Sequence, residues 1–244
     1  MTKTNKLNLT IALLGALALL FSNCKKDDDE KAITVKDIDG NVYKTVKIGE
    51  QVWMAENLRT TRYNDGINIP TGHTNEQWIG LETGAYAISP HTVIIDGLNS
   101  DTEVLEAYGA LYNWFAVETG KLCPAGWHVP SLDELTTLIN NAGGIQSAGG
   151  KLKSIRTSPE PHPRWWSPNT GATDDFGFSA LPGGVRQFHD GRCFDIGGSG
   201  YLWSITVAEP TLGSGIVMEY SEGYAFTYDG FHQNNGFSVR CIRD

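Results

Sequence analysis

The stretch that decides the fold is Leu122-Cys-Pro-Ala-Gly-Trp-His-Val-Pro-Ser-Leu-Asp-Glu-Leu135, with its continuation to Gly143-Gly144. Ser131 and Glu134 form an S-x-x-E capping box, which predicts that a helix begins here, and the glycine pair predicts where it ends. The apolar residues between them share one helical face, so the helix must pack against a core: Leu132, Leu135, Leu138, Ile139 and Ala142. A cysteine and a tryptophan directly precede the helix. This placement indicates a crosslinked, buried helix in a small, loop-rich domain.

The N-terminal segment has the pattern of a secretion signal. Lys3 and Lys6 precede an apolar run from Leu9 to Phe21, and Cys24 follows. This run is short for a bilayer core of roughly 30 Å, so a spanning helix is the less favoured alternative. Leu20-Phe-Ser-Asn-Cys24 resembles a bacterial lipoprotein cleavage box, although Asn23 stands where Gly or Ala is usual. We therefore expect residues 1–23 to be a signal peptide and Cys24 to carry lipid.

A charged run follows the cysteine. Lys25-Lys-Asp-Asp-Asp-Glu30 cannot bury itself, so residues 24–31 are interpreted as a flexible acidic tether. The run also resembles the acidic segment that follows the lipid cysteine in surface-exported lipoproteins of Bacteroidota-type bacteria. The resemblance implies a protein anchored in the outer membrane and exposed at the cell surface. A periplasm-facing anchor, with a linker that holds no export signal, is the alternative.

Composition limits the partners. Two of the 19 basic residues lie in the signal segment, so the remaining 221 residues would carry 17 basic and 28 acidic residues and a formal net charge of −11. An acidic chain with no basic stripe argues against nucleic acid, and it leaves the lipid as the expected membrane contact. The length suits a single domain, which we place at residues 32–244.

Three cysteines remain after Cys24, in a compartment that permits disulfides. Three pairings are possible, and three reduced thiols are a further alternative. We favour Cys123 with Cys241, because this bond would join the start of the helix to the last strand across a long loop and contribute a few kcal/mol. Cys193 would then be free.

The other predicted elements are mainly short strands. Asp39-Gly40 and Gly49-Glu50 suit two-residue turns between three β-prone runs near the start of the domain. Residues 59–103 are predicted to be loops with a brief strand at 85–88. Residues 104–117 are predicted to form a first helix that Gly120 ends, and the chain after Gly149-Gly150 is predicted to be irregular. We predict an α+β fold with two main helices, N-terminal hairpins and a small twisted antiparallel sheet. The predicted strands are residues 33–38, 42–48, 51–54, 201–207, 216–220, 224–228 and 237–242.

Six blocks with a recognisable pattern occur in order along the chain. They are Asp37-Ile-Asp-Gly-Asn-Val-Tyr43, Ile48-Gly-Glu-Gln-Val-Trp-Met-Ala-Glu-Asn-Leu58, Tyr108-Gly-Ala-Leu-Tyr-Asn-Trp114, Leu122-Cys-Pro-Ala-Gly-Trp-His-Val-Pro130, Gly171-Ala-Thr-Asp-Asp-Phe-Gly-Phe-Ser-Ala-Leu-Pro-Gly-Gly184 and Gly236-Phe-Ser-Val-Arg-Cys-Ile-Arg-Asp244. Together they resemble the Fibrobacter succinogenes major paralogous domain, a family of secreted proteins and lipoproteins. The family looks related in fold to C-type lectins and to the formylglycine-generating sulfatase-modifying enzymes. The resemblance therefore implies a C-type-lectin-like fold, in which a disulfide ties a helix to the last strand.

The same resemblance raises two chemistries that the residues do not favour. The sulfatase-modifying enzymes use a reactive cysteine pair near the C-terminus, but here Cys241 has no second thiol near it in sequence, so we expect no enzyme activity. Calcium-dependent lectins need a set of carboxylate and amide oxygens, which this chain lacks, although Asp174-Asp175 could ligate a cation. The six histidines lie singly, without zinc spacing. We expect neither a metal nor a cofactor.

A binding surface is the favoured reading. Aromatic rings beside amide and carboxyl groups suit both sugar rings and protein partners. We therefore expect a non-catalytic recognition or adhesion module that binds a glycan or a surface protein. An enzyme of the formylglycine-generating type and a purely structural envelope subunit are the alternatives. The strand-face aromatics could instead be core, and Trp165 and Trp166 cannot both point inward easily. The candidate ligand-binding residues are Trp165, Trp166, Asn169, Tyr224, Tyr228, Asn234 and Asn235.

Overall fold

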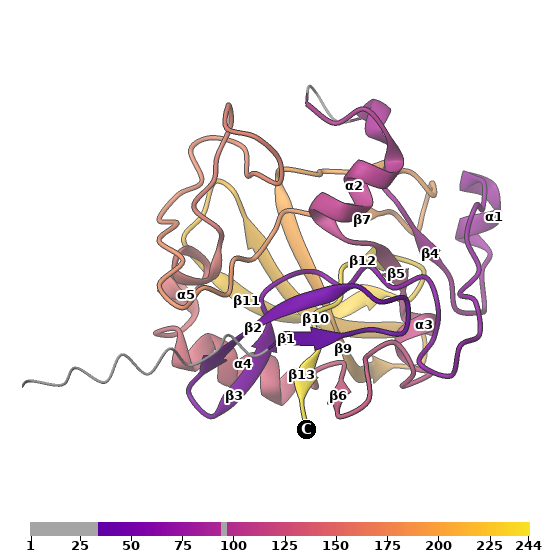
Figure 1. The fold of residues 1–244 in the computed structure, drawn as a ribbon, viewed down its shortest axis with the longest axis horizontal. Coiled ribbons are helices and arrows are strands. Elements are labelled where there is room, and N and C mark those ends of the chain that lie inside the picture. The colour runs from indigo at the N-terminus through magenta and orange to yellow at the C-terminus, as the bar shows by residue number, and fades with distance from the viewer. Residues whose placement is uncertain (1–33, 94–96) are drawn as a thin grey trace, which may run out of the picture. The chain divides into compact units, whose positions relative to one another are not determined.

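The computed structural model describes residues 34–93 and 97–244, which belong to one unit of the chain. Within these ranges 31% of the residues are in strands or β-bridges and 18% in helices, and the strands form three sheets (Figure 1). The predicted signal peptide, the tether and Cys24 lie outside the described residues. Within the residues that the structure describes, no helix has both the length and the hydrophobicity needed to span a membrane.

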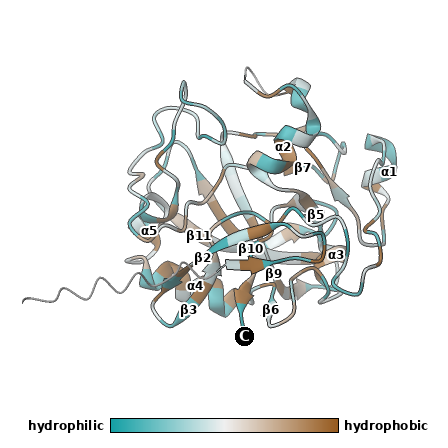
Figure 2. Ribbon diagram, viewed as in Figure 1, coloured by the Kyte–Doolittle hydropathy of each residue, from teal (hydrophilic) through white to brown (hydrophobic). Residues whose placement is uncertain are grey.

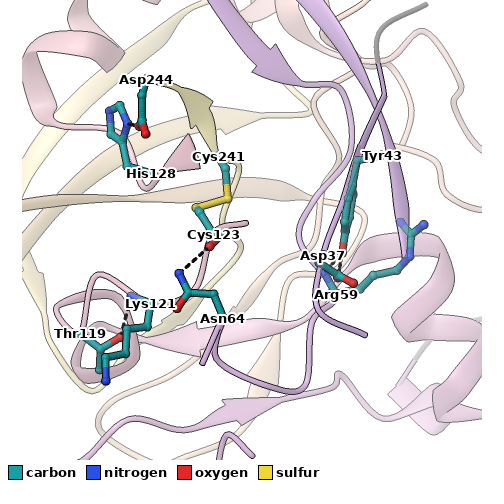
Figure 3. Close-up of a disulfide and its surroundings, with 10 residues drawn as sticks. All are labelled: Asp37, Tyr43, Arg59, Asn64, Thr119, Lys121, Cys123, His128, Cys241 and Asp244. Atoms are coloured by element: carbon teal, nitrogen blue, oxygen red, sulfur yellow. Dashed lines mark hydrogen bonds and ion pairs between the residues drawn. A yellow bond between two sulfur atoms is a disulfide. The ribbon is translucent and has the colours of Figure 1, made fainter. Parts of the chain in front are cut away.

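The first sheet contains the predicted N-terminal hairpins and the end of the chain. Its strand order is β1 (Thr34–Lys36), β2 (Val42–Ile48), β3 (Gln51–Met54), β13 (Ile242–Arg243) and β6 (Trp127–His128). Asp37 stabilises the first turn, since its carboxylate accepts a hydrogen bond from the Asn41 amide at 2.9 Å. It also accepts one from the Tyr43 hydroxyl at 2.6 Å (Figure 3). The three predicted strands at 33–54 are therefore confirmed.

Two further sheets complete the fold. The second contains β11 (Ala225–His232), β10 (Leu212–Glu219) and β9 (Ser199–Glu209), in that order. The third contains β4 (Tyr86–Ala87), β5 (Leu111–Asn113), β12 (Gly236–Phe237), β7 (Val185–Arg186) and β8 (Cys193–Phe194), in that order. Every strand of the third sheet is two or three residues long. Most of its neighbouring strands are far apart in sequence, as the strand order shows.

The predicted central helix is confirmed as α4 (Leu132–Asn141), with both halves of the Ser131–Glu134 capping box formed. Its face of Leu135, Leu138 and Ile139 is buried. A second helix that was not predicted, α5 (Ile145–Leu152), follows it and includes the glycine pair after which the chain is expected to be irregular. A Cβ on Gly149 would lie 1.9 Å from the Tyr224 carbonyl oxygen, so glycine is there because another backbone packs directly against the helix.

The predicted helix over 104–117 is wrong. The chain instead forms α2 (Asp101–Tyr108), then strand β5, then the short helix α3 (Trp114–Val117). Gly109 separates α2 from β5 with φ +80°, and a Cβ there would lie 2.7 Å from Cβ of Asn57. Residues 111–113 pair with β4 and β12, and these tertiary hydrogen bonds override the helical spacing of their apolar side chains. Helix α1 (Asn75–Ile79) and the 3₁₀ turn η1 (His91–Val93) lie in the segment predicted as loop.

The predicted fold class is also wrong. The described residues are mostly β, with three sheets and only short helices, and they do not have the expected C-type-lectin-like α+β arrangement of two main helices and one small sheet. The closing segment at 237–242 contributes to this difference in fold. The sequence predicts a single strand there, but the segment divides between β12 and β13, which belong to different sheets.

Two apolar clusters hold these layers together, and Figure 2 shows the hydrophobic residues concentrated along the strands and on parts of α4. One cluster surrounds the disulfide and includes Trp203, Phe237 and Cys241. The other fills the space between α4, α5 and the second sheet, with Trp53 and Trp165 fully buried in it. Each cluster contains more than a dozen buried side chains, so the apolar contacts, rather than any one helix, stabilise the fold.

Candidate functional site

The expected disulfide is present between Cys123 and Cys241, with a Cα–Cα distance of 5.9 Å (Figure 3). Both cysteines are almost fully buried, and the amide of Asn64 donates a hydrogen bond to the Cys123 carbonyl at 3.1 Å. The bond connects the segment before α4 to the segment before β13. Cys241 is therefore held as part of a structural crosslink.

Cys193 is the free cysteine of the described residues, as expected. It is half-buried in β8, and burial raises the pKa of its thiol, although the Arg186 guanidinium opposes that rise. A thiol with a raised pKa is mostly protonated at neutral pH and is a poor nucleophile. The surroundings of Cys193 do not activate it.

Two of the candidate ligand-binding residues in the proline-rich loop are structural. Trp165 has no exposed surface, and its indole N–H donates to the Ala180 carbonyl at 3.0 Å. Asn169 is 5% exposed and donates its amide to the Ser154 carbonyl at 3.0 Å. Its φ of +50° suits the local hydrogen bonding of an asparagine. Neither side chain lies at the surface, so neither Trp165 nor Asn169 belongs to an exposed binding surface.

The amide-rich segment Gln233–Asn235 is also internal. Asn234 donates its side-chain amide to the Leu81 carbonyl at 2.6 Å, and Asn235 accepts from the Phe188 amide at 3.1 Å. Both residues are less than 9% exposed. Their amides join the segment before β12 to distant loops, so Asn234 and Asn235 do not belong to an exposed binding surface either.

The remaining three candidates do reach the surface. Trp166 is 44% exposed and Tyr228 47%, while Tyr224 is half-buried. The Trp166 ring meets the Tyr220 ring edge-on, with the centroids 5.5 Å apart. Of the adjacent tryptophans, one therefore lies in the core and the other at the surface.

Alternation along β11 places Tyr224, Phe226 and Tyr228 on one face of the strand, because Ala225 points into the core on the other face. The rings of Tyr224 and Phe226 contact each other, with their centroids 5.8 Å apart. Tyr220, which follows β10, packs against the apolar cluster that contains Ala225 and contacts Trp166. We call these five residues the aromatic row: Trp166, Tyr220, Tyr224, Phe226 and Tyr228.

Carboxylates accompany the aromatic row. Partial desolvation, together with the charges of Glu219 and Glu222, raises the pKa of the Tyr224 hydroxyl. Asp229 is exposed next to Tyr228. The strand β11 that carries the row is at the edge of its sheet. The surface therefore combines apolar ring faces, phenol hydroxyls and hydrogen-bond acceptors.

A second feature is a polar cleft of about 850 Å³, which the sequence did not indicate. Strand β2, the residues after β3, the end of α2 and two loops form its walls. Three side chains are basic (Lys44, Arg59 and Arg156) and four are acidic (Glu56, Glu106, Glu160 and Asp174). The other lining residues are Thr45, Val46, Ala55, Asn57, Ala107, Gly109, Ser154, Ile155, Pro163, Gly177, Ser179 and Leu181.

A fully buried arginine supports the floor of this cleft. Arg240 donates from Nε to the Asn57 Oδ1 at 2.9 Å, and from its two Nη atoms to the carbonyls of Phe178 and Ser179. Burial lowers the pKa of its guanidinium to about 9, and the charges of Asp174 and Glu56 oppose that shift. Arg240 thus remains a cation at neutral pH beneath the cleft.

The residues that build this floor lie in sequence blocks already noted as family-like. Asn57 belongs to the block at 48–58, Ser179 to the block at 171–184, and Arg240 to the closing block at 236–244. The blocks were a usable signal, but their meeting point depends on tertiary contacts. No group of three or more His, Cys, Asp or Glu that could hold a metal ion occurs within residues 34–93 and 97–244.

Comparison with known proteins gives one match. The family model described as the Fibrobacter succinogenes major domain matches residues 46–243, which is most of the chain. No curated protein and no solved structure matches the chain.

Proposed function

The chain belongs to the Fibrobacter succinogenes major domain family, and we propose that it is a non-catalytic recognition module that binds glycan through the aromatic row. The observation that carries this proposal is the placement of the row. Tyr224, Phe226 and Tyr228 lie along the edge strand β11, and Tyr220, which follows β10, contacts Trp166. The two most exposed members of the row, Trp166 and Tyr228, are each more than 40% exposed. Sugar rings stack on such faces through their C–H groups.

The polar groups beside the row support the same ligand class. A sugar presents a belt of hydroxyls that donate and accept hydrogen bonds. Burying such a group on binding costs free energy unless it is paired with a hydrogen-bond partner. The Tyr224 and Tyr228 hydroxyls and the carboxylates of Glu219 and Asp229 can supply those partners. A partner protein at the cell surface would use the same aromatic surface, and it is the second candidate.

An enzyme of the formylglycine-generating type is less well supported. Such chemistry needs reactive thiols, whereas Cys241 is buried in a disulfide, and the thiol of Cys193 has a raised pKa. A purely structural envelope subunit would not need exposed aromatic rings, and it would show no glycan binding.

The glycan proposal is tested with a soluble Cys24→Ser chain, residues 24–244, on a glycan array. Binding is expected for at least one glycan, and Trp166→Ala and Tyr228→Ala should each weaken it by roughly tenfold or more, as loss of a stacked ring does. Phe194→Ala is the matched control, because Phe194 is 59% exposed but lies in β8, outside the aromatic row. Equal losses in all three variants, or no binding to any glycan together with co-purification of a protein, would contradict the proposal.

The location proposed for this module is the outer membrane, with the lipid on Cys24 as anchor and the domain exposed at the cell surface. Palmitate should label the wild type and fail to label Cys24→Ala. Protease treatment of intact cells should then remove the domain. Equal labelling of both chains would refute the anchor, and protection from the protease would favour a periplasm-facing domain.

A further inference from the structure

We propose that the polar cleft is a second binding site, specific for an extended peptide segment of another protein that carries a basic, an acidic and an aliphatic side chain. This inference does not depend on glycan binding by the aromatic row, because the cleft and the row are lined by different residues.

The size of the cleft fits a short peptide. A volume of about 850 Å³ lies within the range of roughly 300–1,000 Å³ that is typical of ligand pockets. The cleft is formed by segments far apart in sequence, from Lys44 to Leu181. It is therefore a feature of the folded domain rather than of one loop.

Its floor is rigid. The side-chain amide of Asn57 already makes three hydrogen bonds. Its oxygen accepts from Arg240, and its nitrogen donates to the Tyr108 carbonyl at 2.9 Å and to the Ser238 hydroxyl at 3.1 Å. Ser179 donates its hydroxyl to the Asp174 carboxylate and its carbonyl accepts from Arg240. A floor with its groups already paired loses little entropy when a ligand binds.

The rim differs from the floor because it carries charges that are not neutralised within the described residues. The Arg59 and Glu56 side chains form an ion pair at 2.9 Å, whereas Lys44 and Glu106 form none. Arg156 donates only to backbone carbonyls, at 3.3 Å. Both signs of charge are thus available to a ligand, which favours a ligand that carries both.

An apolar side chain adds to these charges. Ile155 is 65% exposed at the cleft, although isoleucine is among the residues most often buried. A ligand with an aliphatic side chain would cover it.

The residue types of the lining favour a peptide over a sugar in this cleft. None of its lining residues is aromatic, so there is no ring on which a sugar could stack.

The test is a positional-scanning hexapeptide library covering all amino acids, applied to the ¹⁵N-labelled soluble Cys24→Ser chain and read by NMR shifts of the cleft amides. Peptides with Lys or Arg, Asp or Glu, and an aliphatic residue should bind, and affinity should fall as salt rises. Ile155→Ala and Arg156→Gln should each weaken binding at least fivefold. The matched controls Ile145→Ala and Arg192→Gln alter exposed residues outside the cleft and should leave binding unchanged.

Three outcomes would overturn the proposal. One is the absence of any shift in the cleft amides at peptide concentrations up to about 1 mM, which corresponds to roughly −4 kcal/mol. Another is peptide binding that the control variants weaken as much as the cleft variants do. The third is a shift of the cleft amides by a glycan from the array but by no hexapeptide, which would assign the cleft to sugar.

Discussion

Removal of the Cys123–Cys241 disulfide should strongly destabilise the domain. The double variant Cys123→Ala/Cys241→Ala removes a crosslink that spans 118 residues. For a loop of that length, the chain-entropy relation gives about 16 cal/mol/K, or about 5 kcal/mol at 25 °C. Since a native domain is stable by only about 5–15 kcal/mol, the variant should lose a third or more of its stability or fail to fold.

Urea unfolding at 25 °C measures this effect. The free energy of unfolding is extrapolated to water for the soluble Cys24→Ser chain and for the same chain with the double substitution, and the slopes are compared. Cys193→Ser is the control, because that cysteine lies outside the disulfide and should change stability by less than about 1 kcal/mol. A loss below about 1 kcal/mol in the double variant, with unchanged slope, would refute the entropic argument.

Three further predictions concern local contacts. Gly149→Ala should lower stability by about 1–3 kcal/mol in urea unfolding, because the new Cβ would meet the Tyr224 carbonyl at 1.9 Å. Lys153→Met should lower stability by about 2 kcal/mol or more in the same assay, because three carbonyls that accept from the buried ammonium would lose their partner. His128 should stabilise the fold more at pH 5 than at pH 8, measured as the difference in unfolding free energy between wild type and His128→Gln.

The sign for His128 follows from its neighbours. Desolvation lowers the pKa of the imidazole, but hydrogen bonds to Asp244 at 2.6 Å and to Glu134 at 3.0 Å outweigh it, so the pKa in the folded state is raised (Figure 3). The stabilisation is therefore complete below the unfolded pKa of about 6.5 and is lost as pH rises through the folded pKa. The side chain is 40% exposed, so solvent screening keeps the effect small. A difference that grew with pH would contradict this assignment.

Matched variants separate these effects from general sensitivity to mutation. Gly80→Ala should be tolerated, because the nearest atom to its new Cβ is 3.9 Å away. Lys47→Met removes a lysine that is 59% exposed and should cost less than about 1 kcal/mol. If Gly80→Ala were as damaging as Gly149→Ala, the close-approach argument would fail.

The sequence alone determined the elements whose signals are local. The capping box of Ser131 and Glu134 determined the start of α4, and Gly49-Glu50 forms the predicted two-residue turn between β2 and β3. The turn predicted at Asp39-Gly40 is wrong in length, because residues 37–41 connect β1 to β2. The pairing of Cys123 with Cys241 and the family were also correct. The helix start and the hairpin turn depend on residues within a few positions, the disulfide on one long connection suggested by a cysteine next to a helix, and the family on six blocks in order along the chain.

Only the tertiary structure decided the rest. Residues 111–113 have helical spacing but form a strand, because their hydrogen-bond partners come from β4 and β12. Gly149 lies within α5, where it lets another backbone approach the helix. Trp165 and Trp166 are adjacent and chemically identical, yet one is fully buried and the other 44% exposed. Burial and the polar cleft both depend on which distant segments meet, and a linear pattern of side chains does not contain that information.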